Sequence, residues 1–195
     1  LHAKGVLILS SYLRAKFGRD RAIHFSASIA MEQNYGGVEG DSATMAELAA
    51  LISAITDLPI RQDVGITGSM NQMGEIQPIG GVNVKIEGFF AACQLKGFTG
   101  TQGVIIPQQN VRHLMLRPEI VQAVEQGLFT VHAVGHAEEA LELLLGVPMG
   151  VANSKGKYPE QSVMGRVLAQ LKQWHKIDKG DKPKKSKKKK KDKKT

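Results

Sequence analysis

The chain has 195 residues, a net charge of +8 at neutral pH and a single cysteine, Cys93. One thiol excludes an internal disulfide framework and indicates a reducing compartment, which we expect to be the cytoplasm. No stretch reaches the ~18 apolar residues of a membrane-spanning helix, so we expect no membrane partner. The first residues carry neither an initiator Met nor the layout of a signal peptide. This start indicates a piece of a longer protein.

Helices and strands are mixed along the chain. A helix over residues 5–17 ends at Gly18, and residues 22–32 alternate between apolar and polar side chains, as a half-buried strand does. A glycine-rich loop follows. We then expect, in order, a helix over 42–56, a hairpin over 63–79 that turns near 71–74, a helix over 82–96 ended by Gly97, a strand over 103–107, a helix over 118–126, a strand over 128–134, and helices over 136–145 and 159–176. This order predicts an α+β (mixed α/β) fold.

The positive charge is concentrated at the C-terminal end. Residues 155–195 contain 16 Lys or Arg and 4 Asp or Glu, whereas residues 1–154 contain 10 and 14. The folded part is therefore expected to be mildly acidic, which argues against a globular face that binds nucleic acid. Nucleic acid or another polyanion remains a possible partner of the tail.

The composition also divides the chain into three parts. We expect one domain over residues 1–150, a helical extension over 151–178 and a Lys-rich tail over 179–195. The tail has almost no apolar side chains to offset the entropy lost on ordering, which predicts disorder.

A serine lies where the glycine-rich loop meets the second predicted helix, in the sequence Gly40-Asp41-Ser42-Ala43. The first backbone N–H groups of a helix lack partners inside it and favour negative charge, so an oxyanion formed at Ser42 would find donors there. The small residues Gly40 and Ala43 leave room for a substrate backbone. The alternative is that Asp41 or Ser42 only caps the helix, a role that both residue types favour.

A lysine, Lys85, lies among apolar residues in the helix predicted over 82–96. Removing water from around a lysine disfavours its charged form. An uncharged Lys85 could take the proton from a serine hydroxyl without any histidine. The alternative is an ordinary lysine that extends from the helix into solvent.

Other reactive residues indicate no further site. His132 and His136 have a spacing that suits a metal on a helix, but His132 falls in a predicted strand and no third ligand is near, so we expect no metal. Cys93 is expected to be a core residue.

Several short motifs follow one another along the chain, and their order is informative. They are Gly40-Asp41-Ser42-Ala43, Ile66-Thr67-Gly68-Ser69, Gly74-Glu75-Ile76, Pro78-Ile79-Gly80-Gly81 with Lys85, Gly103-Val104-Ile105-Ile106-Pro107, and the closing Glu138-Glu139-Ala140-Leu141-Glu142-Leu143-Leu144-Leu145-Gly146. With a spacing of 43 positions from Ser42 to Lys85, this series resembles the proteolytic domain of Lon proteases over roughly residues 4–150. The sequence Glu39-Gly40-Asp41-Ser42 is similar to that of the archaeal-type and Lon-related branch of the family.

The resemblance implies a fold of small sheets packed with helices, here without the domain's N-terminal strands. It implies a serine endopeptidase in which Ser42 is the nucleophile and Lys85 the general base. Thr67 would orient the lysine, unless it is only a strand threonine chosen for β-propensity. The resemblance also implies that Glu39 corresponds to an acidic residue close to the catalytic pair formed by Ser42 and Lys85. Because a carboxylate there would oppose an uncharged lysine, we expect Glu39 to swing away on substrate binding or to mark an inactive resting state.

The resemblance also implies partners. The chain contains no GxxxxGK[ST] loop, so ATP and Mg would be used by a separate ATPase module, in cis or in trans, and this chain would bind no cofactor. Substrates would be unfolded or damaged proteins, and the assembly a hexameric ring of identical subunits. Two alternatives stay open: a catalytically silent Lon-like assembly domain of an ATPase, and polyanion binding through the tail.

Overall fold

The computed structural model describes residues 2–18, 23, 25–32 and 35–180 of the chain. In this part the helices are α1 (His2–Phe17), α2 (Thr44–Thr56), α3 (Val82–Lys96), α4 (Pro118–Glu125), α5 (Ala137–Leu145) and α6 (Val163–Asp178), with the 3-10 helix η1 (Gln108–His113). The strands are β1 (Val64–Ile66), β2 (Ser69–Met70), β3 (Ile76–Gln77), β4 (Gly103–Pro107) and β5 (Thr130–Val134). None of the described helices is long and apolar enough to cross a membrane.

Three parallel strands form the main sheet, in the order β1-β4-β5. All five residues of the middle strand, β4, are buried, which is typical of a parallel strand covered on both faces. β2 and β3 form a separate antiparallel pair, in which Ser69 lies opposite Gln77 and Met70 opposite Ile76. Small sheets packed with helices confirm the predicted mixed α/β fold.

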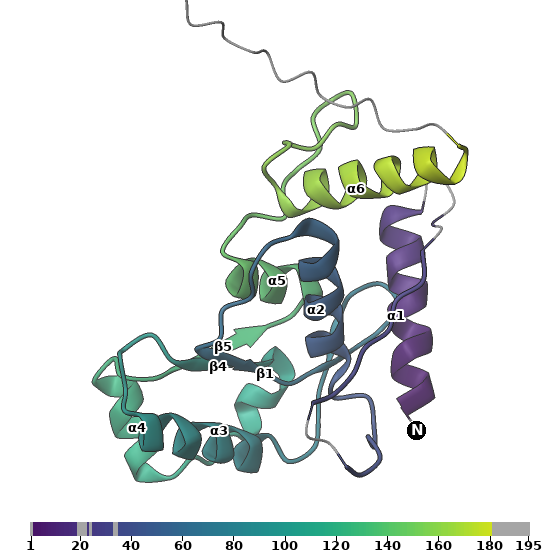
Figure 1. The fold of residues 1–195 in the computed structure, drawn as a ribbon. Helices are drawn as coiled ribbons and strands as arrows, with labels where there is room; N and C mark the ends of the chain where they lie inside the picture. The colour runs from purple at the N-terminus through teal and green to yellow at the C-terminus, as the bar shows by residue number, and fades with distance from the viewer. Residues whose placement is uncertain (1, 19–22, 24, 33–34, 181–195) are drawn as a thin grey trace, which may run out of the picture.

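Helices cover both faces of the main sheet and divide the interior into two cores (Figure 1). Ile105 of β4 belongs to the core formed with α1, α2, α5 and α6, whereas Val104 and Ile106 belong to the core on the side of α3 and α4. Successive side chains of a strand point to opposite faces, so β4 contributes to both cores. Helix α2, which begins just after Ser42, and helix α3, which carries Lys85, therefore lie on opposite sides of the sheet.

The predicted strand over 22–32 is wrong. Its described residues, 23 and 25–32, form no strand. Some of its apolar side chains pack instead against the first core, where the rings of Phe25 and Trp174 lie 5.7 Å apart between centroids. Ile23 and Phe25 are only partly buried and Ile29 is exposed, so the alternation does not mark one buried face here. A strand also needs a neighbouring strand for its backbone hydrogen bonds.

The other elements differ from the predictions mainly at their ends. The hairpin predicted over 63–79 is shorter, because β1 pairs with β4 and only β2 and β3 pair across the turn. The last helix begins at Val163 rather than at residue 159, since the hydroxyl of Ser162 caps it by accepting from the backbone N–H of Gly165. Most of the tail predicted to be disordered, residues 181–195, lies outside the described residues.

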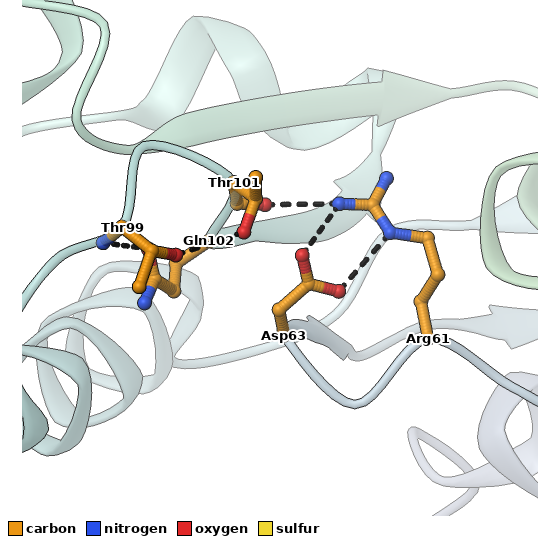
Figure 2. A network of polar contacts seen from close by, with 5 residues as sticks. All are labelled: Arg61, Asp63, Thr99, Thr101 and Gln102. Carbon is orange, nitrogen blue, oxygen red and sulfur yellow. Dashed lines mark hydrogen bonds and ion pairs between the residues drawn. The ribbon is translucent and has the colours of Figure 1, made fainter.

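Arg61 joins the start of β1 to the loop before β4 (Figure 2). Its guanidinium donates two hydrogen bonds to the carboxylate of Asp63, at 3.0 and 2.8 Å, and one to the carbonyl oxygen of Thr101, at 2.9 Å. The side-chain oxygen of Gln102 accepts from the backbone N–H and the hydroxyl of Thr99, which braces the same loop. These bonds hold β1 beside β4 at the start of β1, whereas Thr67 follows the other end of this strand.

Replacing Asp63 with asparagine removes the charged partner of Arg61 and is expected to lower the free energy of unfolding by about 1 kcal/mol at pH 7. The effect is no larger because both side chains are partly exposed and solvent screens their charges. Hydrogen bonds from Arg61 lower the pKa of Asp63 from 3.8 to about 2. A carboxyl whose pKa is lower in the folded state stabilises the fold above its unfolded pKa and loses this effect as the pH falls through the folded one. Urea unfolding should therefore show the difference between wild type and Asp63→Asn shrinking from pH 5 towards pH 2. A difference that is constant with pH would contradict this assignment.

Candidate active site

Ser42 lies in the short segment that leads into α2. Gly40 has φ +77°, a left-handed conformation that glycine adopts without strain. The N-cap of α2 is Ala43, and no side chain caps the helix. The alternative that Asp41 or Ser42 serves as the side-chain cap is therefore wrong, and the hydroxyl of Ser42 is free of that role.

Asp41 points to α1 rather than to a reacting group. Its carboxylate accepts a hydrogen bond from Nζ of Lys4 at 2.7 Å. This hydrogen bond is the main cause that holds the pKa of Asp41 below its ordinary value. The carbonyl oxygen of Asp41 accepts from the hydroxyl of Thr44 at 2.6 Å. Asp41 thus joins the segment that carries Ser42 to α1 through its carboxylate and to the first residue of α2 through its carbonyl oxygen.

Gly68 holds the serine segment against the end of β1. Its backbone N–H donates to the carbonyl oxygen of Ser42 at 2.9 Å, and its carbonyl oxygen accepts from the N–H of Met45 at 3.2 Å. A Cβ at residue 68 would lie 3.3 Å from the Met45 side chain, so a glycine suits this close approach. Gly68 belongs to one of the motifs found in the sequence, but its contact with the Ser42 segment was not predicted from it. A glycine two residues after a short apolar strand was the available signal.

Lys85 reaches the serine from the first turn of α3. The helix starts after Gly81, whose φ of +66° again suits glycine. Nζ of Lys85 donates to Oγ of Ser42 at 3.1 Å and to Oγ1 of Thr67 at 3.4 Å. Three segments far apart in the sequence therefore bring a hydroxyl, an amine and a second hydroxyl together. A hydroxyl within hydrogen-bond reach of an amine is the arrangement that a nucleophile and its general base require.

Lys85 is exposed in the described chain. The buried residues of α3 are Val82, Ile86, Phe90 and Cys93, which face the second core. The lysine therefore extends from the outer face of an apolar helix. Removal of water from its amine would have to come from a bound substrate or from another chain.

The backbone around Ser42 offers hydrogen-bond donors. Within the described residues, no hydrogen bond has the N–H of Ser42 or Ala43 as its donor. Both groups lie ahead of a helix, where the local field favours negative charge. They are therefore available to an oxyanion formed at the carbon that Ser42 attacks.

Glu39 is exposed and takes no part in the contacts of the lysine. The ion pairs of the described residues do not include one between Glu39 and Lys85. The expectation that Glu39 moves on substrate binding or marks a resting state stays a prediction. A Glu39→Gln variant with an unchanged pH–rate profile would contradict it.

An open cleft of about 570 Å³ adjoins the amine and the two hydroxyls. Its polar side chains are those of Ser42, Thr67 and Lys85, and every other lining residue is apolar or glycine. The cleft offers space for a substrate side chain next to the group that would attack.

The two histidines considered for a metal lie in different surroundings, and one of them caps a helix. His132 lies on β5, where burial lowers its pKa. His136 follows β5 and caps α5, because its Nδ1 accepts from the N–H of Glu138 while its Nε2 lies 3.2 Å from the carbonyl oxygen of Met73. This arrangement engages both ring nitrogens of His136. Within the described part, no group of three His, Cys, Asp or Glu residues is arranged to hold a metal ion.

Replacing Thr67 with valine is expected to lower kcat for peptide hydrolysis about tenfold, because the amine of Lys85 loses one hydrogen-bond acceptor. Valine keeps the β-branched shape, so a threonine present only for strand propensity would predict no change. Thr130→Val on β5 is the matched control. Steady-state kinetics with one peptide substrate measures the effect, and equal activity of Thr67→Val and wild type would contradict the positioning role.

Comparison with known proteins places the chain in a family. Residues 5–147 match the Lon protease (S16) C-terminal proteolytic domain. The chain is 49% identical to a putative Lon protease homolog of Escherichia coli (strain K12) over 89% of its length, and 33% identical to the archaeal Lon protease of Pyrococcus abyssi over 78%. It spans 29% and 16% of the lengths of these two relatives. The chain belongs to the family of Lon protease (S16) C-terminal proteolytic domains.

Proposed function

We propose that this chain is a serine-type endopeptidase domain in which Ser42 and Lys85 form the catalytic dyad. The observation that carries the proposal is the 3.1 Å hydrogen bond between Nζ of Lys85 and Oγ of Ser42. Membership of the Lon family supports it, because the family gives peptide-bond hydrolysis as the reaction. The free N–H groups of Ser42 and Ala43 supply the remaining element that acyl transfer requires.

The first half of the reaction forms an ester on Ser42. The uncharged amine of Lys85 accepts the hydroxyl proton as Oγ attacks the carbonyl carbon of the substrate. The carbonyl oxygen becomes an oxyanion, which the N–H groups of Ser42 and Ala43 stabilise. Lys85 then gives its proton to the leaving nitrogen, the C–N bond breaks, and an acyl-enzyme remains.

The second half returns the enzyme to its starting state. Water attacks the ester carbon while Lys85 accepts a proton from it, and a second oxyanion forms at the same carbon. When this intermediate collapses, the C–Oγ bond breaks, and the proton returns to Oγ of Ser42. Thr67 holds the amine in line during both halves, since its Oγ1 accepts a hydrogen bond from Nζ.

The complete enzyme is proposed to be an ATP-dependent protease of the cytoplasm. An ATPase module, in cis or in trans, would use ATP and Mg to unfold protein substrates and deliver them to a hexamer of these domains. The family supports this proposal, and the chain spans under a third of the length of the relatives quoted above.

Incubation with an unfolded protein tests the peptidase activity directly. The proposal predicts new amino termini, found by mass spectrometry, and their loss when Ser42 is replaced with alanine. Cleavage that is equally fast in that variant would come from a contaminant and would contradict the assignment. No cleavage by wild type, together with no covalent labelling of Ser42, would favour the silent assembly domain.

A further inference from the structure

The start of α1 is packed tightly against the segment that carries Ser42. Gly5 is buried, and a Cβ added to it would lie 2.9 Å from the hydroxyl oxygen of Thr44 and 3.9 Å from Asp41. Thr44 is fully buried and is the first residue of α2. A glycine inside a helix is less stable there than alanine, so its presence at residue 5 is explained by this close approach.

Lys4 adds an ion pair to the same contact. Its Nζ lies 2.7 Å from Oδ2 of Asp41, and 70% of the Lys4 side chain and 24% of the Asp41 side chain are exposed. The hydrogen bond from Lys4 is the main cause that lowers the pKa of Asp41. Burial acts in the opposite direction, and a hydrogen bond with the Ser69 side chain lowers the pKa further. Asp41 therefore carries a negative charge at neutral pH.

This charge lies next to the groups that would stabilise the oxyanion. Asp41 directly precedes Ser42, whose backbone N–H is one of the available donors. A negative charge at this place opposes the negative charge that develops on the substrate carbonyl oxygen. The cation of Lys4 offsets this repulsion and holds the carboxylate against α1. An exposed ion pair contributes little to the stability of a fold, so an effect on the rate can be separated from an effect on stability.

We propose that Lys4 is a positioning residue for the reaction, which neutralises the carboxylate of Asp41 and directs it away from the oxyanion. The inference rests on the proposed peptidase function. Lys4 acts through Asp41 and not on the substrate. Because the repulsion that it removes arises only when the oxyanion forms, kcat depends on Lys4 and KM does not.

Methionine in place of Lys4 removes the charge and keeps most of the length of the side chain. Lys4→Met is expected to lower kcat for a peptide about tenfold with an unchanged KM, and to slow the labelling of Ser42 by a fluorophosphonate by the same factor. Lys4→Arg keeps the charge and should be as active as wild type. Lys16→Met is the matched control, because it removes an ion pair with Glu138 from the same helix. This control should be fully active.

Asparagine at residue 41 distinguishes the charge from the contact. Asp41→Asn alone should stay within about threefold of wild type, and the double variant Lys4→Met with Asp41→Asn should recover to the same level, because no carboxylate is left to neutralise. A purely structural role of the ion pair predicts that all three variants lose activity in step with their free energies of unfolding, measured with urea. A double variant as slow as Lys4→Met would overturn the inference.

The wild-type chain separates this inference from the proposed function. If it neither labels with the fluorophosphonate nor cleaves any peptide, the proposed function is overturned and this inference with it. If it labels and cleaves, and Lys4→Met does so at the same rates, only the role of Lys4 is overturned.

Discussion

Alanine in place of Ser42 is expected to lower kcat/KM for peptide hydrolysis by about 10⁴-fold or more, since the nucleophile is lost. The only hydrogen bond of this hydroxyl within the described residues is the one from Lys85, so the fold loses little. Unfolding by urea should give a free energy within about 0.5 kcal/mol of wild type. Hydrolysis of a fluorogenic peptide, measured at the same protein concentration, gives the loss in rate.

Ser154→Ala is the matched control, because Ser154 is an exposed serine far along the chain from the site. It should retain full activity. If Ser42→Ala retained activity within about tenfold of wild type, a different nucleophile would have to be sought.

Methionine in place of Lys85 is expected to lower the rate constant of acylation by about 10³-fold, in line with the contribution of a general base. Methionine is unbranched and apolar, so it preserves the packing of the lysine stem while removing the amine. Lys96→Met, at the other end of α3, is the control and should be fully active. The measurement is single-turnover hydrolysis, which reports on acylation rather than on product release.

Arginine at residue 85 distinguishes a base from a charge. A guanidinium stays protonated in proteins and cannot accept the serine proton. Lys85→Arg should therefore be as inactive as Lys85→Met. Retained activity in the arginine variant would mean that a positive charge suffices, and the base role of Lys85 would have to be abandoned.

The local elements could be predicted from the sequence because their signals are local. Apolar spacing and the glycine at residue 97 define α3, whose C-cap is Gly97, and the continuous apolar run over 103–107 is the central strand β4. The order of motifs, with Ser42 and Lys85 among them, gave the family, which the match over residues 5–147 confirms.

The rest depends on contacts between distant segments. Nothing in residues 63–66 indicates that β1 pairs with β4 rather than with the following strand. Nothing in residues 22–32 shows that the described part of this segment has no partner strand among the described residues. The exposure of Lys85 follows from which face of α3 meets the second core. The cleft likewise exists only once the start of α2 and helix α3 meet at β1 from its two sides, so it could not be inferred from the residues near Ser42 or Lys85 in the sequence.

The rate at which a fluorophosphonate modifies Ser42 tests the coupling of the amine to the hydroxyl most directly. Intact-mass spectrometry counts the adducts, and peptide mapping locates them. The account predicts one adduct per chain, on Ser42, formed at least about 100-fold more slowly in Lys85→Met than in wild type. Equal rates with and without the lysine amine, or an adduct on another residue, would contradict it.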